Sequence, residues 1–206
     1  SEVTNFTEEE ILEGLLANSK YKPVESGKIY NIVNMGYGTV IYENTNGNQV
    51  RCQSADKSKF SQYWRIINEN GKYYIQNVLS ERYIKKQNGA FSQIYSTSAT
   101  KSASANGFTL SKTDNDTEHT YAIVDQNPAG LHCDASSNVV GWYYTDNNNS
   151  IWGFQPVEVT EEEIAEARKS YVEYEALSKN LSAYNTHMKA LFSDLAFTAL
   201  KEEIAA

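Results

Sequence analysis

The sequence has few of the residues that mark several common protein classes. Its 206 residues include two cysteines and three prolines, and no run of Lys or Arg is longer than Lys85-Lys86. The net charge of -8 argues against nucleic-acid binding, which needs a basic surface, and disfavours adsorption to an anionic membrane. No apolar run approaches the roughly 20 residues of a spanning helix. We therefore expect neither nucleic acid nor an inserted membrane among the partners.

The two cysteines, Cys52 and Cys133, are 81 positions apart. They have neither the spacing of a metal site nor the density of a disulfide scaffold. We expect two half-buried free thiols. A single long-range disulfide stays open as the alternative, because both residues lie on predicted strands.

Catalytic motifs are also missing. There is no nucleophilic serine elbow, no H-E-x-x-H zinc motif and no glycine-rich phosphate loop. The three histidines are far apart, and although His132 adjoins Cys133, neighbours on a strand face opposite ways. No residue pair is nominated for glycoside hydrolysis. We predict a protein that is not an enzyme and that uses no cofactor and no metal.

The residues that are present favour a packed domain, with 40% hydrophobic and 21% charged side chains. Three zones follow one another. Residues 1–28 hold a helix at 7–17, begun by a capping box of Thr7 and Glu10, and a linker. Residues 29–157 are short runs rich in β-branched and aromatic residues, separated by Gly, Asn, Asp and Ser, which predicts about twelve strands in an all-β barrel or sandwich.

Residues 158–206 form the third zone and are helical, with Thr160 and Glu163 repeating the capping box. Their apolar residues recur at spacings of 3 and 4, namely Leu181, Tyr184, Met188, Leu191 and Leu195. Core packing explains this stripe, and a coiled-coil partner helix is the alternative. Asn180 and Ser182 are candidate positions for a break into a hairpin, and Ser193 for the start of a last helix.

The β zone is internally periodic. Trp64, Phe108 and Trp152 are spaced by 44 residues, and each is followed two positions later by an apolar residue. This spacing predicts three units of about 44 residues, whose aromatic residues meet inside one pseudo-threefold barrel.

These residues carry a resemblance to a known family. Gln62-Tyr63-Trp64 resembles the Q-x-W signature of ricin-B-type β-trefoil lectins, and Asn149-Ser150-Ile151-Trp152 and Gly107-Phe108 resemble altered copies of it. The phrase GLHCDASSNVVGW is similar to trefoil modules of secreted proteins from gut anaerobic bacteria. The resemblance implies a β-trefoil over residues 29–157 that binds carbohydrate, secreted or on the cell surface, within a larger polypeptide.

In this family, each unit can hold one sugar between a carboxylate and a stacking aromatic ring. Carried over, the third unit supplies Asp134 as the carboxylate and Trp142 as the ring, supplemented by Tyr143. Asn149 stands at the family's Asn, and Ser150 replaces the expected Gln. Two bland interpretations stay open: Asp134 as a turn residue and Trp142 as a barrel-wall aromatic.

The first two units match less well. The first offers Glu43 and Gln62, and the second offers Tyr95 but has Lys86 at the acid position. We expect both sites to be degenerate, with Glu43 solvated, and Trp64 and Trp152 to be core residues. The rival hypothesis is a structural trefoil that has lost its sugar sites and contacts a neighbouring domain or another protein.

Overall fold

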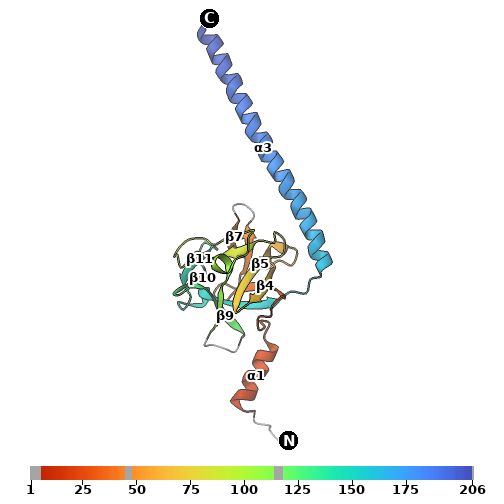
Figure 1. Cartoon of the computed structure of the whole chain (residues 1–206), viewed down its shortest axis with the longest axis vertical. Helices are drawn as coiled ribbons and strands as arrows, with labels where there is room; N and C mark the ends of the chain where they lie inside the picture. Colours follow the sequence, from red (N-terminus) through yellow and green to blue (C-terminus); the bar gives the residue numbers. More distant parts are fainter. Residues whose placement is uncertain (1–5, 45–47, 114–117, 206) are drawn as a thin grey trace. The chain divides into compact units, whose positions relative to one another are not determined.

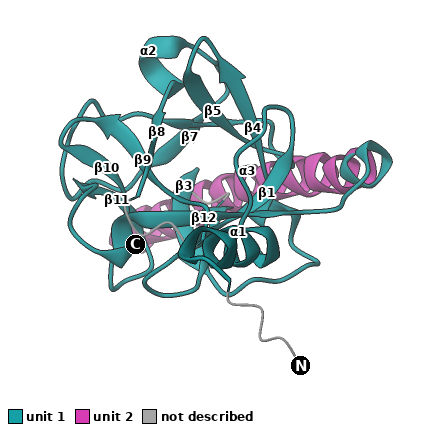
Figure 2. Ribbon diagram, turned by 90° about the horizontal axis from the view of Figure 1, so that it is seen from below, with its two compact units in different colours: residues 1–164 teal, residues 165–206 magenta. Residues whose placement is uncertain are grey.

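The structure is a computed structural model that describes residues 6–44, 48–113 and 118–205. It divides into two compact units, residues 1–164 and 165–206, which are coloured separately in Figure 2. The first unit contains α1 (Glu8–Asn18), all the strands described below and the first residues of α3 (Glu161–Ala205).

The described strands all lie between Ile29 and Pro156. They are β1 (Ile29–Asn34), β2 (Val40–Asn44), β3 (Gln49–Gln53), β4 (Trp64–Glu69), β5 (Lys72–Asn77), β6 (Tyr83–Lys85), β7 (Ser96–Ser98), β8 (Thr109–Lys112), β9 (Thr120–Gln126), β10 (Ala129–Cys133), β11 (Val139–Tyr143) and β12 (Ile151–Pro156). Short helices interrupt them at η1 (Phe60–Gln62), α2 (Ala103–Asn106) and η2 (Asn148–Ser150). The alternation of apolar and polar residues along these runs places one face of most strands in the interior.

The strands close into a barrel. β1, β2, β3, β7, β6, β5 and β4 pair in that order, and β4 pairs back to β1, which makes a ring of seven strands. β1 also pairs with β12, and the sheet continues through β9, β10 and β11, with β8 on the other edge of β9 (these strands are labelled in Figure 2). Closure removes the edges of the ring strands, which would otherwise expose unpaired backbone groups.

The three spaced aromatic residues share one core, as the sequence predicts. Trp64, Phe108 and Trp152 are fully buried in a single cluster of apolar side chains. The indole Nε1 of Trp64 donates to the carbonyl of Ile41 at 3.0 Å, and that of Trp152 donates to the carbonyl of Leu131 at 2.9 Å. Each indole therefore fills the interior and also satisfies a buried backbone acceptor.

Cys52 and Cys133 are free thiols in this same core. A hydrogen bond with the Cys133 thiol and burial both raise the pKa of Cys52. The expectation of free thiols agrees with this state, although both side chains are buried rather than half-buried.

Both predicted capping boxes are present. The Thr7 hydroxyl accepts from the Glu10 N–H, and the Glu10 carboxylate accepts from the Thr7 N–H. Thr160 and Glu163 make the same reciprocal pair at the start of α3. These caps satisfy N–H groups that have no acceptor within the first turn of a helix.

The predicted break in the C-terminal segment is wrong. α3 runs without interruption from Glu161 to Ala205, through Asn180, Ser182 and Ser193. Asn and Ser in a helix interior each cost only about 0.5 kcal/mol relative to Ala, which the many good helix formers around them offset. The helix of the second unit is continuous in Figure 1.

Candidate functional site

The β10–β11 hairpin and the short helix η2 carry the residues of the third predicted 44-residue unit that are expected to bind a sugar. Gly130 pairs with Trp142 and His132 pairs with Val140 across this hairpin. Leu131 is buried in the barrel core. Because successive side chains alternate between faces, His132 and Trp142 lie on the side of the hairpin away from that core.

Trp142 is the centre of a surface cluster of three aromatic rings, hereafter the aromatic cluster. Its ring centroid is 5.9 Å from that of Phe91 and 5.9 Å from that of Tyr143, and both contacts are edge-to-face. The rings of Phe91 and Tyr143 are 4.8 Å apart. Tyr143 is 48% exposed and Phe91 is 37% exposed, while Trp142 is half-buried. The cluster therefore presents apolar ring surface to solvent.

Hydrogen bonds fix the orientation of the Trp142 ring. Its Nε1 donates to Oδ2 of Asp146 at 2.9 Å, and the Asn147 amide donates to the same oxygen at 3.1 Å. Asp146 and Asn147 also line a cavity of about 490 Å³, together with Lys112, Tyr144 and other residues. A polar cavity thus adjoins the aromatic cluster through Asp146.

His132 and Ser150 contact the cluster: the His132 ring centroid is 6.1 Å from that of Trp142, and Ser150 bonds the backbone of Tyr143. The buried Ser150 hydroxyl donates to the Tyr143 carbonyl at 2.8 Å and lies 2.9 Å from Nδ1 of His132. Because the hydroxyl proton is used on Tyr143, Nδ1 of His132 is the donor to Ser150. Burial lowers the pKa of His132 and so favours its neutral form. Ser150 is therefore placed where it positions the backbone of Tyr143.

Asp134 is not brought to the aromatic cluster. One of its carboxylate oxygens accepts from the N–H groups of Ser136 and Asn138, both at 2.8 Å, and the other accepts from the Asn138 amide at 3.0 Å. It lies at the turn of the hairpin, four strand positions from the residue that faces Trp142, which is roughly 13 Å along a strand. In this structure Asp134 is a turn residue, the alternative stated from the sequence.

Asn149 joins two parts of the backbone. Its N–H donates to Oδ1 of Asn147 at 2.8 Å, and its carbonyl accepts from the Asn34 amide at 2.8 Å. Its own side-chain oxygen occupies the space beside Gly36, where a Cβ would approach it to 1.7 Å. Gly36 is required there because any side chain would collide with Asn149.

In the first two predicted units, Gln62 and Tyr95 are both fully buried. Gln62 braces a loop, because its amide donates to the Ser54 carbonyl and its oxygen accepts from the Asp56 N–H. Tyr95 donates its hydroxyl to Asp125 at 3.1 Å, and burial raises its pKa. The expectation of Tyr95 as a stacking platform is corrected, because neither face of its ring reaches solvent.

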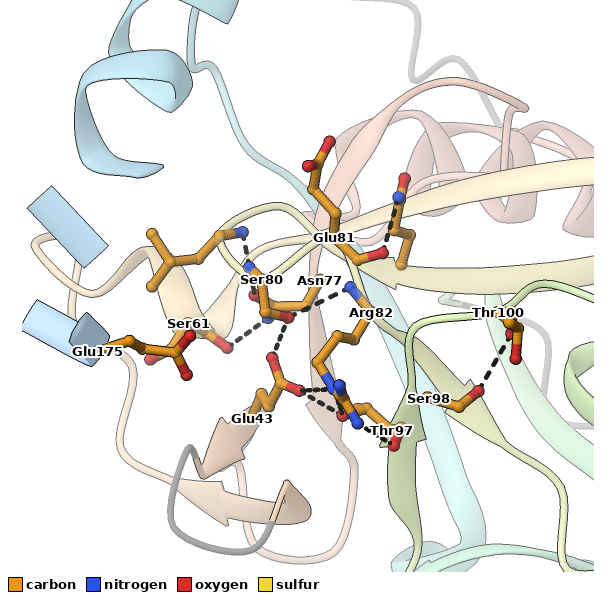
Figure 3. Close-up of polar contacts among 12 residues, drawn as sticks. Glu43, Ser61, Asn77, Ser80, Glu81, Arg82, Thr97, Ser98, Thr100 and Glu175 are labelled. Carbon is orange, nitrogen blue, oxygen red and sulfur yellow. Dashed lines mark hydrogen bonds and ion pairs between the residues drawn. The ribbon is translucent and has the colours of Figure 1, made fainter. Parts of the chain in front are cut away.

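Glu43 is also buried, at 3% exposure, which corrects the expectation of a solvated side chain. Figure 3 shows its carboxylate beside Ser80, Arg82 and Thr97 of the second predicted unit. It accepts hydrogen bonds from the Ser80 and Thr97 hydroxyls, and it pairs with Nε of Arg82 at 3.5 Å. Its acceptor capacity is used inside the protein.

The residue at the acid position of the second predicted 44-residue unit is also paired inside the protein. Lys86 stands there and pairs with Asp125 of the third predicted unit at 3.7 Å. The other oxygen of Asp125 accepts from the Gln87 N–H at 2.6 Å. The first two predicted 44-residue units therefore have no exposed carboxylate where the family resemblance would place a sugar acceptor.

A second cavity of about 490 Å³ is lined by Asn31, Phe60, Tyr63, Glu158 and other residues. Tyr63 is buried there and donates its hydroxyl to the Lys57 carbonyl. This cavity has no exposed pair of rings comparable with the aromatic cluster, so the cluster is the stronger candidate site.

Sequence reasoning missed Phe91, Asp146 and the supporting role of His132. Asp146 follows Trp142 by four positions, a separation that a short loop can close, so this partner had a local signal. Phe91 comes from a loop 51 positions before Trp142, and nothing in its own neighbourhood marks it.

Across 6–44, 48–113 and 118–205, no three His, Cys, Asp or Glu side chains are grouped so that they could hold a metal ion. In the same part of the chain, no helix combines the length and apolarity needed to cross a membrane.

Comparison with known proteins identifies the fold. No protein-family model and no curated protein sequence matches the chain. Among solved structures, the chain is similar to a ricin B-like lectin of Macrolepiota procera in complex with lactose, with a TM-score of 0.57 and 15% identity, over 65% of this chain and 99% of that one. A designed threefold symmetric protein, ThreeFoil, matches with a TM-score of 0.55 and 16% identity, over 63% of this chain and 99% of that one.

A GlcNAcα1-4Gal-releasing endo-β-galactosidase from Clostridium perfringens matches with a TM-score of 0.56 and 16% identity, over 66% of this chain and 34% of that one. Together these likenesses show that the chain contains a β-trefoil fold. Helices α1 and α3 precede and follow it in the sequence.

Proposed function

We propose that this protein is a non-catalytic carbohydrate-binding module and that its sugar site is the aromatic cluster with the adjoining polar cavity. The observation that carries the proposal is the exposure of Tyr143 and Phe91 around a Trp142 ring held by Asp146. A pyranose has one face of C–H bonds, which packs on a flat ring, and a rim of hydroxyls, which needs polar partners. The cluster supplies the rings and the cavity supplies the polar groups.

Asp146 is the carboxylate best placed to accept from sugar hydroxyls. One of its oxygens holds Trp142 and Asn147, and the side chain lines the cavity. The proposal thus keeps Trp142 and Tyr143 as ring contacts and Ser150 as a supporting residue. In this proposal Asp146, rather than Asp134, is the carboxylate that accepts from the sugar hydroxyls.

Three further features belong to this proposal. The spacing of Trp64, Phe108 and Trp152 and their shared core support three pseudo-repeats, with Gln62-Tyr63-Trp64 as the Q-x-W of the first. The match to one third of a much longer galactosidase chain supports a module within a larger polypeptide, whose other domains are its partners. We also propose a secreted or surface bacterial protein as its setting.

The test is a glycan-array screen of the whole chain, followed by titration calorimetry with the best glycan. Trp142→Ala is expected to reduce affinity at least tenfold, since truncation of a central aromatic side chain removes a major part of the contact energy. Tyr37→Ala is the matched control, because Tyr37 is 49% exposed outside the cluster. A folded Trp142→Ala variant that binds like the wild type would exclude this site.

The second candidate function is a structural trefoil without sugar binding. It is favoured by one observation: Glu43, Lys86 and Asp134, at the three acid positions, are all engaged within the protein. This candidate predicts that the wild-type chain binds no glycan on the array, while its aromatic cluster contacts another protein domain.

A further inference from the structure

The helix of the second unit has an apolar stripe that nothing in its own unit covers. The stripe follows a strict alternation of 3 and 4 residues and consists of Tyr174, Leu177, Leu181, Tyr184, Met188, Leu191 and Leu195. All of these except Met188 are large exposed side chains, with exposed fractions between 42% and 67%. A heptad pattern of this kind is the seam along which two helices pack in a coiled coil.

We propose that α3 pairs with α3 of a second copy of this chain in an antiparallel coiled coil. If each exposed side chain of the stripe contributes about 100 Å², two helices would bury roughly 1,200 Å², the lower bound of a stable specific interface. The stripe occupies the a and d positions of the heptad, with Tyr174, Leu181, Met188 and Leu195 at a.

The antiparallel register matches the side chains of the stripe in size. It sets each a residue against a d residue of the other copy, and three consecutive layers become Leu177 with Leu195, Leu181 with Leu191, and Tyr184 with Met188. Each Leu meets a Leu, and Tyr184 meets a flexible thioether that adapts to a ring. A parallel register would instead stack Tyr184 on Tyr184 and Met188 on Met188.

Charge distinguishes the two registers further. In the antiparallel pair the flanking g positions face one another, which places Glu173 opposite Lys201 at both ends of the stripe. The Lys201 amine lies over the ring of its own Phe197, 4.5 Å from the centroid, near the edge of the stripe. In the parallel register Glu173 would face the uncharged Ser178. Charge complementarity therefore favours the antiparallel second copy.

The first experiment measures the mass of the whole chain by sedimentation equilibrium from about 1 to about 100 μM. A monomer–dimer equilibrium is expected, with a limiting mass twice the chain mass of 23.2 kDa. Leu181→Glu should weaken dimerisation about a hundredfold, because it buries a charge in the seam of both copies. Leu200→Glu is the matched control, since Leu200 is 52% exposed outside the stripe, and it should leave the dimer unchanged.

The second experiment tests the register. Glu173→Lys should weaken dimerisation roughly fivefold by turning two attractive pairs into repulsive ones, and Glu173→Lys with Lys201→Glu should restore it. Near-ultraviolet circular dichroism checks that each variant keeps its folded core.

A chain that stays monomeric throughout the range would overturn the proposal, whether its stripe then packs on its own first unit or binds a different protein. A dimer insensitive to Leu181→Glu would also overturn it. Sensitivity to Leu181→Glu without rescue by the double charge exchange would overturn the antiparallel arrangement.

Discussion

Replacing Glu43 tests whether the acid position of the first predicted 44-residue unit contributes to stability instead of sugar binding. Its carboxylate is 3% exposed and accepts from two hydroxyls, and it is paired with Arg82. Removing one member of a buried ion pair costs about 3–5 kcal/mol, because the remaining charge loses its partner. The Arg82 side chain is 27% exposed and keeps its bond to the Thr97 carbonyl, so we expect Glu43→Ala to cost about 3 kcal/mol, near the lower end.

The measurement is urea and thermal unfolding followed by near-ultraviolet circular dichroism. A loss of about 3 kcal/mol in the free energy of unfolding corresponds to a fall in Tm of roughly 10 °C for a domain of this size. Glu43→Gln keeps the shape and part of the hydrogen bonding, and should cost about 1–2 kcal/mol. Glu69→Ala is the control, since Glu69 is 48% exposed in its pair with Lys101 and should change stability by less than about 0.5 kcal/mol.

Two results would refute this reasoning. A loss below about 1 kcal/mol in Glu43→Ala would mean that the buried network contributes little. A stable Glu43→Ala variant that no longer binds the glycan bound by the wild type would mean that the first predicted 44-residue unit binds a sugar.

Three further predictions follow from single contacts. Trp152→Phe removes the donor to the buried Leu131 carbonyl and should cost about 2–4 kcal/mol in urea unfolding; an unchanged midpoint would contradict this. His132 has a lowered pKa in the fold, so protonation favours the unfolded state and stability should fall as pH drops below about 6.5. His132→Asn should flatten this part of the pH–stability profile, and an identical profile would rule out His132 as its source. Gly141→Ala would place a Cβ 2.0 Å from the Ala90 carbonyl oxygen and should cost about 2–3 kcal/mol; wild-type Tm would show that the loop yields freely.

The fold could be predicted from the sequence because its signals are local or periodic. The capping pairs of Thr7 and Thr160 lie three residues from their partners, and Trp64 and Trp152 are marked by even spacing. The burial of Glu43 and Tyr95 could not be predicted, because their partners lie 30 or more positions away in a neighbouring unit. Whether an acid faces solvent or is enclosed beside a half-buried arginine depends on contacts that a single sequence does not display.

The candidate site was predicted in part. Trp142 and Tyr143 belong to the proposed site, and they were predicted because the family resemblance places its stacking ring at Trp142, with Tyr143 next to it. Asp134 was expected beside them, but its carboxylate accepts from the N–H groups of its own turn. Asp side chains commonly bond nearby backbone N–H groups in turns, and such bonds use the acceptors that a sugar would need. The replacement partner, Asp146, comes from the loop after the strand.

The free thiols of Cys52 and Cys133 are natural probes of how often the barrel opens. Both are sealed in the central cluster, and the chain has no other cysteine. An alkylating reagent can reach them only when the barrel opens, so the rate of modification in native buffer measures how often that happens. Mass spectrometry of the labelled chain would thus time the opening of the barrel without any introduced probe.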